Sequence, residues 1–153
     1  MGNLLKDSSW WREYNNSWQS YFTFMILFHI VSVIGLVYSP LHWLWLTLIG
    51  VILFRHIGGE IGAHRYFCHT QFEAKPWAHK FMAICGLFIF QGTHFPWVAF
   101  HRRHHEKSDT PEDPHSPHYL SPVDVWFTNW RQEIYEHRLY ADLVKDPFLK
   151  LLH

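Results

Sequence analysis

The first third of the chain carries a long run of apolar residues without charge. No Asp, Glu, Lys or Arg occurs from residue 14 to residue 54. A helix needs about 20 mostly apolar residues to cross a bilayer core, and Ser39-Pro40 divides the run where proline ends a helix. The pattern therefore predicts two membrane-spanning helices, from Trp18 to Tyr38 and from Leu41 to about Ile57. A buried helical hairpin of a soluble protein is the alternative interpretation.

Basic residues flank this uncharged run on both sides. Lys6 and Arg12 precede the first predicted helix, and Arg55 and Arg65 follow the second. Because cytoplasmic segments next to membrane helices carry an excess of Lys and Arg, both outer ends of the predicted hairpin are expected on the cytoplasmic side.

The pattern beyond residue 57 predicts further helices and one ordered loop. Residues 78–95 are apolar, but their unbroken apolar stretch suits a helix at the membrane surface better than a third span. Four prolines predict a loop over 108–122, and the aromatic and charged residues of 123–144 are typical of surface helices. We expect one all-α domain over 1–153: an integral membrane hairpin over 18–57 and a cytoplasmic helical cap over 58–153.

Composition adds an excess of histidine to this picture. The chain has 14 His in 153 residues, while 13 Lys+Arg balance 13 Asp+Glu, so no basic excess indicates a nucleic-acid partner. The two cysteines, Cys68 and Cys85, form no CxxC pair, which argues against a disulfide framework or a thiolate zinc site.

The histidines include two clusters, HRYFCH at 64–69 and HRRHH at 101–105. An α-helix turns about 100° per residue, so His101, His104 and His105 share one face, and the last two diverge enough to serve two neighbouring metal ions. The five-residue offset of His64 and His69 corresponds to about 140° on a regular helix. Those two rings are therefore expected to bind adjacent ions, or one ion if the helix ends between them.

Neutral imidazole is a common protein ligand of Fe, Cu, Zn and Ni. Glu60 is a candidate to orient one imidazole, and a helix-surface ion pair is the alternative for it. Arg65, Arg102 and Arg103 are expected to point away, toward acidic partners or lipid headgroups, because a cation beside a metal site is costly. Bis-histidine haem binding and a membrane metal-binding or transport module remain open, although haem does not need the HxxHH trio.

The segments GAHRYFCH and WVAFHRRHHEKSDTPEDPHSP resemble the first two histidine boxes of the membrane fatty acid desaturase family, particularly the Δ9-type acyl-CoA and acyl-lipid desaturases. The likeness runs from about Gly58 to Pro117 and more loosely through YADLVKDPF. It implies a cytoplasmic di-iron centre and an oxidoreductase that uses O2, reduced to water, to introduce a cis double bond into a saturated acyl chain. It also implies an acyl-CoA or acyl-lipid substrate, and cytochrome b5 or ferredoxin as electron donor.

The resemblance also implies roles for individual residues. Trp97 matches a position near the acyl-chain tunnel, and His115 matches a histidine in the loop that follows the second box. Ala99 and Phe100 stand where animal acyl-CoA enzymes carry charged residues, which favours an acyl-lipid or a differently held thioester. The implied iron ligands and catalytic residues are His64, His69, His101, His104 and His105.

The family's third histidine box follows a second pair of spanning helices, and the sequence supplies no such cluster after His118. We therefore expect a truncated desaturase fold, from a truncated or split gene, whose catalysis needs a missing C-terminal half. A non-catalytic metal-binding fragment, or a partner of a full-length desaturase, is the alternative.

Overall fold

The computed structural model describes residues 18–122 and 136–153, and the predicted all-α class is confirmed over them. The described residues form α-helices, a π-helix, short 3₁₀ turns and loops, without a strand. The chain divides into two compact units. One comprises residues 1–39 with 108–134, and the other comprises residues 40–107 with 135–153.

The first unit contains helix α2 (Trp18–Tyr38), whose bounds are those predicted. The N–H of Ser39 donates a hydrogen bond to the carbonyl of Gly35, and the helix stops before Pro40. Apolar side chains such as Val31 and Val37 are mostly exposed along it. The apolar part with described side chains, Thr23–Tyr38, is shorter than a full span, so this first membrane span stays a prediction.

The loop over residues 108–122 is ordered by side-chain hydrogen bonds, as predicted. The buried carboxylate of Asp113 accepts hydrogen bonds from the N–H groups of Asp109, at 3.0 Å, and His115, at 2.8 Å. The fully buried Ser116 accepts one from the N–H of His118 at 3.2 Å. Such bonds from Asp and Ser to nearby backbone N–H groups fix turns locally. His115 therefore contributes its backbone to the loop structure.

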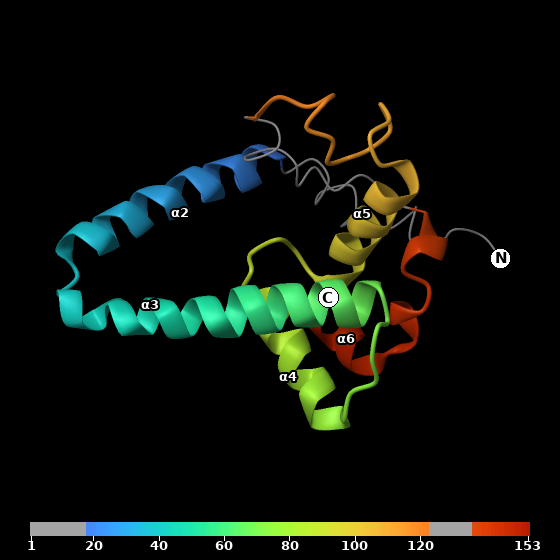
Figure 1. The fold of residues 1–153 in the computed structure, drawn as a ribbon, viewed down its shortest axis with the longest axis horizontal. Helices are drawn as coiled ribbons and strands as arrows, with labels where there is room; N and C mark the ends of the chain where they lie inside the picture. The colour runs from blue at the N-terminus through green and yellow to red at the C-terminus, as the bar shows by residue number, and fades with distance from the viewer. Residues whose placement is uncertain (1–17, 123–135) are drawn as a thin grey trace. The chain divides into compact units, whose positions relative to one another are not determined.

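The second unit is built on one continuous helical segment, Leu41–Cys68, which is long and apolar enough to cross a membrane. It consists of a 3₁₀ turn η1 (Leu41–Trp43), the α-helix α3 (Leu44–Gly50) and the π-helix η2 (Val51–Cys68), drawn as one rod in Figure 1. The predicted end near Ile57 is wrong, because the helix continues to Cys68.

The glycines that follow Ile57 permit close packing and do not break the helix. A Cβ atom placed on Gly58 would lie 2.4 Å from the carbonyl carbon of Cys85, and one on Gly62 would lie 3.0 Å from Cβ of Met82. Both partners belong to helix α4 (Pro76–Leu87), which packs against η2. The absence of side chains at these glycines brings the two helix backbones together.

The interfacial helix predicted over 78–95 is in fact two helices. Helix α4 ends at Leu87, and α5 (His94–Lys107) begins after a turn. Gly92 and Phe90 adopt positive φ angles of 85° and 57° in that turn, a conformation that ends a helix. The new helix start places the second histidine cluster on α5.

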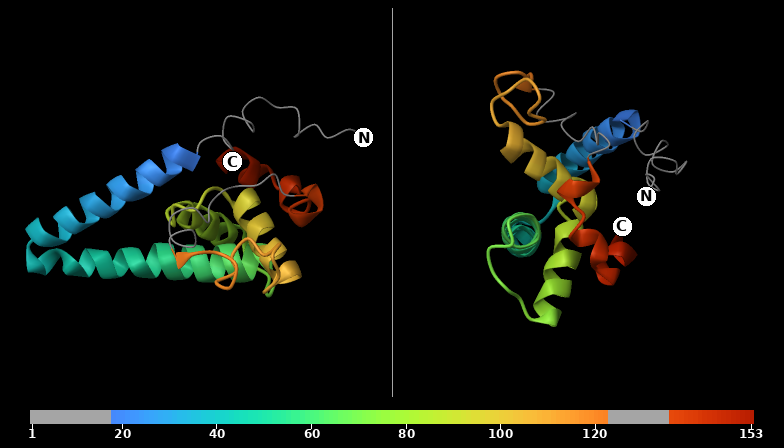
Figure 2. Two further views of the ribbon diagram at one scale, coloured as in Figure 1. Left: turned by 90° about the horizontal axis from the view of Figure 1, so that it is seen from above. Right: turned by 90° about the vertical axis from the view of Figure 1, so that its right-hand side faces the viewer.

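The C-terminal part of this unit packs against α5 and α4. It comprises two 3₁₀ turns, η4 (His137–Leu139) and η5 (Leu143–Lys145), and the short helix α6 (Pro147–Leu152), seen from two further sides in Figure 2. The core that they share with the long helix includes Phe67, Met82, Val98, Leu139 and Leu149. Of the surface helices expected over 123–144, residues 123–135 lie outside the described residues, and the remainder forms 3₁₀ turns.

Candidate metal centre

Four imidazoles from two helices converge in the second unit. Each offers one ring nitrogen, and these four atoms lie within 4.8 Å of one another. His64 lies on η2 and His69 directly follows it, while the other two lie on α5. We call this group the imidazole cluster: His64, His69, His101 and His105. Such spacing brings four nitrogen donors within reach of a common metal site.

The local geometry of η2 explains how His64 and His69 come together. The N–H of His69 donates a hydrogen bond of 3.1 Å to the carbonyl of His64, which is the five-residue bond of a π-helix. One turn therefore spans five residues, and the two ring centroids lie 4.8 Å apart. The angle of about 140° expected from a regular α-helix does not apply, because the turn is wider.

Helix α5 contributes the other pair at the ordinary four-residue spacing. The Nε2 atoms of His101 and His105 lie 3.0 Å apart, as neighbouring residues on one face of an α-helix do. The ring of His101 also lies 4.6 Å from that of His64. The ring of His104 lies 5.9 Å from that of His101, and His104 falls outside the cluster. Its role as a ligand stays a prediction.

The surroundings of two rings in the imidazole cluster favour the neutral form, which can bind a metal. Burial, followed by the neighbouring His64 and His105, lowers the pKa of His101 to about 3. Burial, followed by His64, also lowers the pKa of His69. Since metal ligation requires a deprotonated ring nitrogen, these two residues are prepared for it at neutral pH.

Two further side chains contact the cluster from its edges. A carboxylate oxygen of Glu60 lies 3.7 Å from Nδ1 of His64, and the same side chain pairs with Arg55. The ion-pair interpretation of Glu60 is therefore confirmed, and its role in orienting an imidazole stays a prediction. The indole of Trp97 stacks on the ring of His101, with centroids 5.1 Å apart and planes 14° from parallel. The Trp97 N–H donates to Gln91 at 2.9 Å, a partner that the sequence did not indicate.

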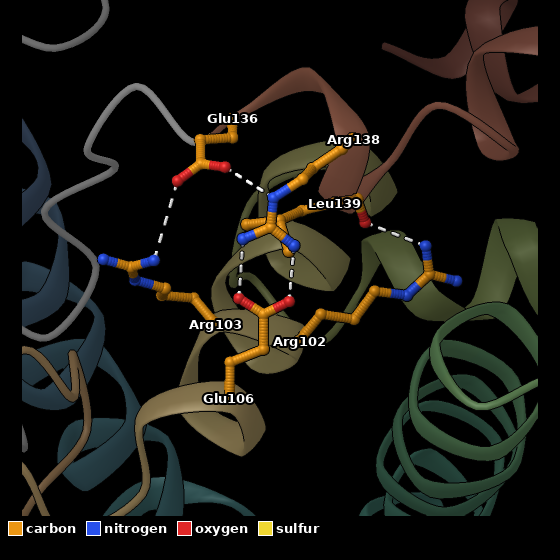
Figure 3. A network of polar contacts seen from close by, with 6 residues as sticks. All are labelled: Arg102, Arg103, Glu106, Glu136, Arg138 and Leu139. Atoms are coloured by element: carbon orange, nitrogen blue, oxygen red, sulfur yellow. Dashed lines mark hydrogen bonds and ion pairs between the residues drawn. The ribbon is translucent and has the colours of Figure 1, made fainter.

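The arginines of the second histidine cluster turn away from the imidazoles, as predicted for a cation beside a metal site. Arg102 forms a two-pronged ion pair with Asp142, with N–O distances of 2.7 and 2.8 Å. Arg103 lies 3.7 Å from a carboxylate oxygen of Glu136, as Figure 3 shows. Arg65 of the first cluster is exposed.

A hydrogen-bonded group around His79 lies outside the imidazole cluster, and the sequence did not predict it. Nε2 of His79 lies 2.8 Å from a carboxylate oxygen of Asp146, and its Nδ1 lies 3.1 Å from the hydroxyl of Tyr66. Asp146 also accepts hydrogen bonds from two N–H groups at the start of α6. These contacts link η2, α4 and α6. The only sequence signal was the loose likeness of the segment YADLVKDPF.

Several known desaturases are similar to this chain. No protein-family model matches the chain, and no solved structure does. The chain is 30% identical over 141 residues to an sn-1 stearoyl-lipid 9-desaturase of Anabaena variabilis, covering 84% of this chain and 49% of the relative. It is 31% identical over 137 residues to human stearoyl-CoA desaturase 5, covering 83% of this chain and 41% of the relative.

A third relative widens the range of acyl carriers. A hex-5-enoyl-[acyl-carrier protein] acetylenase of Moorena producens is 39% identical over 101 residues, which is 60% of this chain and 31% of that protein. Over the matched residues, the chain belongs to the acyl desaturase family. It spans about a third to a half of the length of these desaturase relatives.

Proposed function

We propose that this chain carries a histidine-ligated iron site of a membrane acyl desaturase, which introduces a cis double bond, at Δ9, into a saturated acyl chain with O2 as oxidant. The observation that supports it most directly is the imidazole cluster, four nitrogen donors within 4.8 Å of one another, in a chain whose relatives include stearoyl desaturases. Imidazole suits iron, and it also suits zinc, copper and nickel, so the proposal of iron is supported by the similarity to desaturases.

The donor set fits the proposed di-iron centre in its chemistry. The lowered pKa values of His69 and His101 keep these rings neutral, and His105 is exposed, so one side of the cluster stays open to reactants. When bound, iron would activate O2 for the oxidation of an unactivated C–H bond, which no side chain can achieve. We propose His64, His69, His101, His104 and His105 as its ligands, with further ligands supplied by a C-terminal half.

The chain's own residues would then hold and orient the substrate. We propose that Trp97 lines the path of the acyl chain, because its indole is fixed by Gln91 and lies flat against the ring of His101. The exposed apolar side chains of the helical segment Leu41–Cys68 would place the site next to lipid. In this arrangement the imidazole cluster faces the cytoplasm, beyond the apolar half of that helix.

We further propose an acyl-lipid as the substrate carrier. Ala99 is fully buried and Phe100 nearly so, so neither side chain is available to a CoA headgroup. The names of the relatives include lipid, CoA and acyl-carrier-protein substrates, so this side of the proposal rests on those two residues. Cytochrome b5 or ferredoxin would supply the electrons.

Reconstitution tests the proposal directly. The chain is loaded with ferrous iron in liposomes that contain stearoyl lipid, with O2 and a reductant, alone and together with the C-terminal half of the Anabaena relative. Double bonds are located by mass spectrometry, and His101→Ala serves as the control. We expect bound iron in both arms and, only in the arm with the C-terminal half, a double bond at Δ9 that requires His101. Bound iron without any product in either arm favours a non-catalytic metal-binding fragment, and a parent chain that retains no iron refutes the metal site.

A further inference from the structure

We infer that Arg102 is a positioning residue for the imidazole cluster. Its side chain holds the end of η2 against α5 and against residues 136–153, the C-terminal segment. This inference rests on the proposed metal site. Arg102 follows His101 directly on α5, yet its guanidinium turns away from the imidazoles and toward the backbone that precedes His69.

All five N–H donors of the Arg102 guanidinium have acceptors. Nε donates to the carbonyl of Cys68 at 3.0 Å, and Nη2 donates to that of Phe67 at 3.1 Å. Nη1 donates to the carbonyl of Leu139 at 2.8 Å, and both Nη atoms also donate to the carboxylate of Asp142. A guanidinium offers five donors in a fixed planar fork, so these acceptors define its position fully.

The two η2 carbonyls explain why this clamp bears on the metal site. Phe67 and Cys68 are the last residues of η2, where carbonyls point beyond the helix end and carry partial negative charge. His69 is the next residue, and its backbone position follows from theirs. Arg102 therefore joins the backbone next to one proposed ligand, His69, to the backbone next to another, His101.

Asp142 holds the clamp in place electrostatically. Its fork to Arg102 lowers the pKa of the Asp142 carboxyl, and the Arg102 side chain is only 21% exposed. A charge-assisted fork in such surroundings is stronger and more directional than a single hydrogen bond. The carboxylate therefore keeps the guanidinium facing the η2 carbonyls and away from the imidazoles.

Arg138 provides a matched control on the other side of the same junction. Its guanidinium makes a comparable fork to Glu106 on α5, at 2.5 and 2.8 Å, and contacts Glu136. Arg138 and Arg102 thus both join α5 to the C-terminal segment, as Figure 3 shows. Of the hydrogen bonds that the structure shows for these two arginines, those to the carbonyls of Phe67 and Cys68 come from Arg102.

The experiment compares the same substitution at both arginines in the full 153-residue chain in detergent micelles. Co²⁺ is the probe, because its visible spectrum reports ligand geometry, and affinity is obtained by titration. We expect Arg102→Lys to weaken Co²⁺ binding about tenfold or more and to shift the visible band, since residues that orient metal ligands have effects of this size. Arg138→Lys should leave affinity within about twofold and the band unchanged.

The outcomes separate the inference from the proposed function. A parent chain that binds no Co²⁺ or iron overturns the metal site itself. A parent chain that binds Co²⁺ as tightly as Arg102→Lys, with the same spectrum, overturns the positioning role alone, even if the variant is less stable. If Arg102→Lys does not fold, Asp142→Asn decides instead: a shifted Co²⁺ band supports the role, and an unchanged band refutes it.

Discussion

The crossing of η2 and α4 offers a sharp test, because two adjacent glycines have opposite environments. A Cβ on Gly58 would lie 2.4 Å from the carbonyl carbon of Cys85 and 2.5 Å from its oxygen. A Cβ on Gly59 would lie 3.4 Å from a side-chain carbon of Ile89, an ordinary contact. Alanine should therefore be excluded at the first position and accepted at the second.

The size of the effect follows from the atoms involved. The obstacle at Gly58 is backbone, which cannot rotate aside, so Gly58→Ala must move α4 away from η2. Overpacking of this kind costs about 1–3 kcal/mol, and we expect the upper end of that range. At Gly59 the substitution removes the entropic cost of glycine in a helix, a gain of about 0.5–1 kcal/mol.

The assay is thermal unfolding of the metal-free chain in micelles, followed by circular dichroism. We expect the midpoint of Gly58→Ala to fall below that of the parent, and the midpoint of Gly59→Ala to equal or exceed it. Equal midpoints for the two variants, or a more stable Gly58→Ala, would refute the close crossing.

Three further predictions use the same purified chain. Burial lowers the pKa of His94 to about 4, so between pH 6.5 and 4 the unfolded state binds more protons than the folded state. As the pH is lowered through this window, the free energy of unfolding should therefore fall by up to about 3 kcal/mol, and unfolding of His94→Leu should depend less on pH. Asp146→Ala should cost about 1–2 kcal/mol in thermal unfolding through loss of the α6 cap, whereas Asp146→Asn should recover the cap and leave only the loss of the carboxylate contact with His79. His104→Ala should lower iron content per chain without abolishing it, because its ring lies beside the cluster; unchanged iron content would remove His104 from the site.

The sequence predicted features that depend on local pattern. The bounds of α2 followed from the uncharged run and Pro40, and the shared face of His101 and His105 followed from the period of an α-helix. Both features rest on interactions between residues close in the chain, so periodicity contains the information.

Features that depend on contacts between distant segments were not visible in the sequence. The π-turn that aligns His64 with His69 lies in a helix packed at its glycines against α4. The pairing of Arg102 with Asp142 joins residues forty positions apart. Neither the wider turn nor the identity of an ion-pair partner leaves a periodic signal, so these details required the fold.

The central claim, that the imidazole cluster binds iron, is tested most directly by iron content. The parent chain and single alanine variants are loaded with ferrous iron, desalted and measured by mass spectrometry, with His137→Ala as an exposed control. We expect the control to retain the iron of the parent, and the variants of His64, His69, His101 and His105 to lose it. Iron content that is the same in the parent and in all four variants would contradict it.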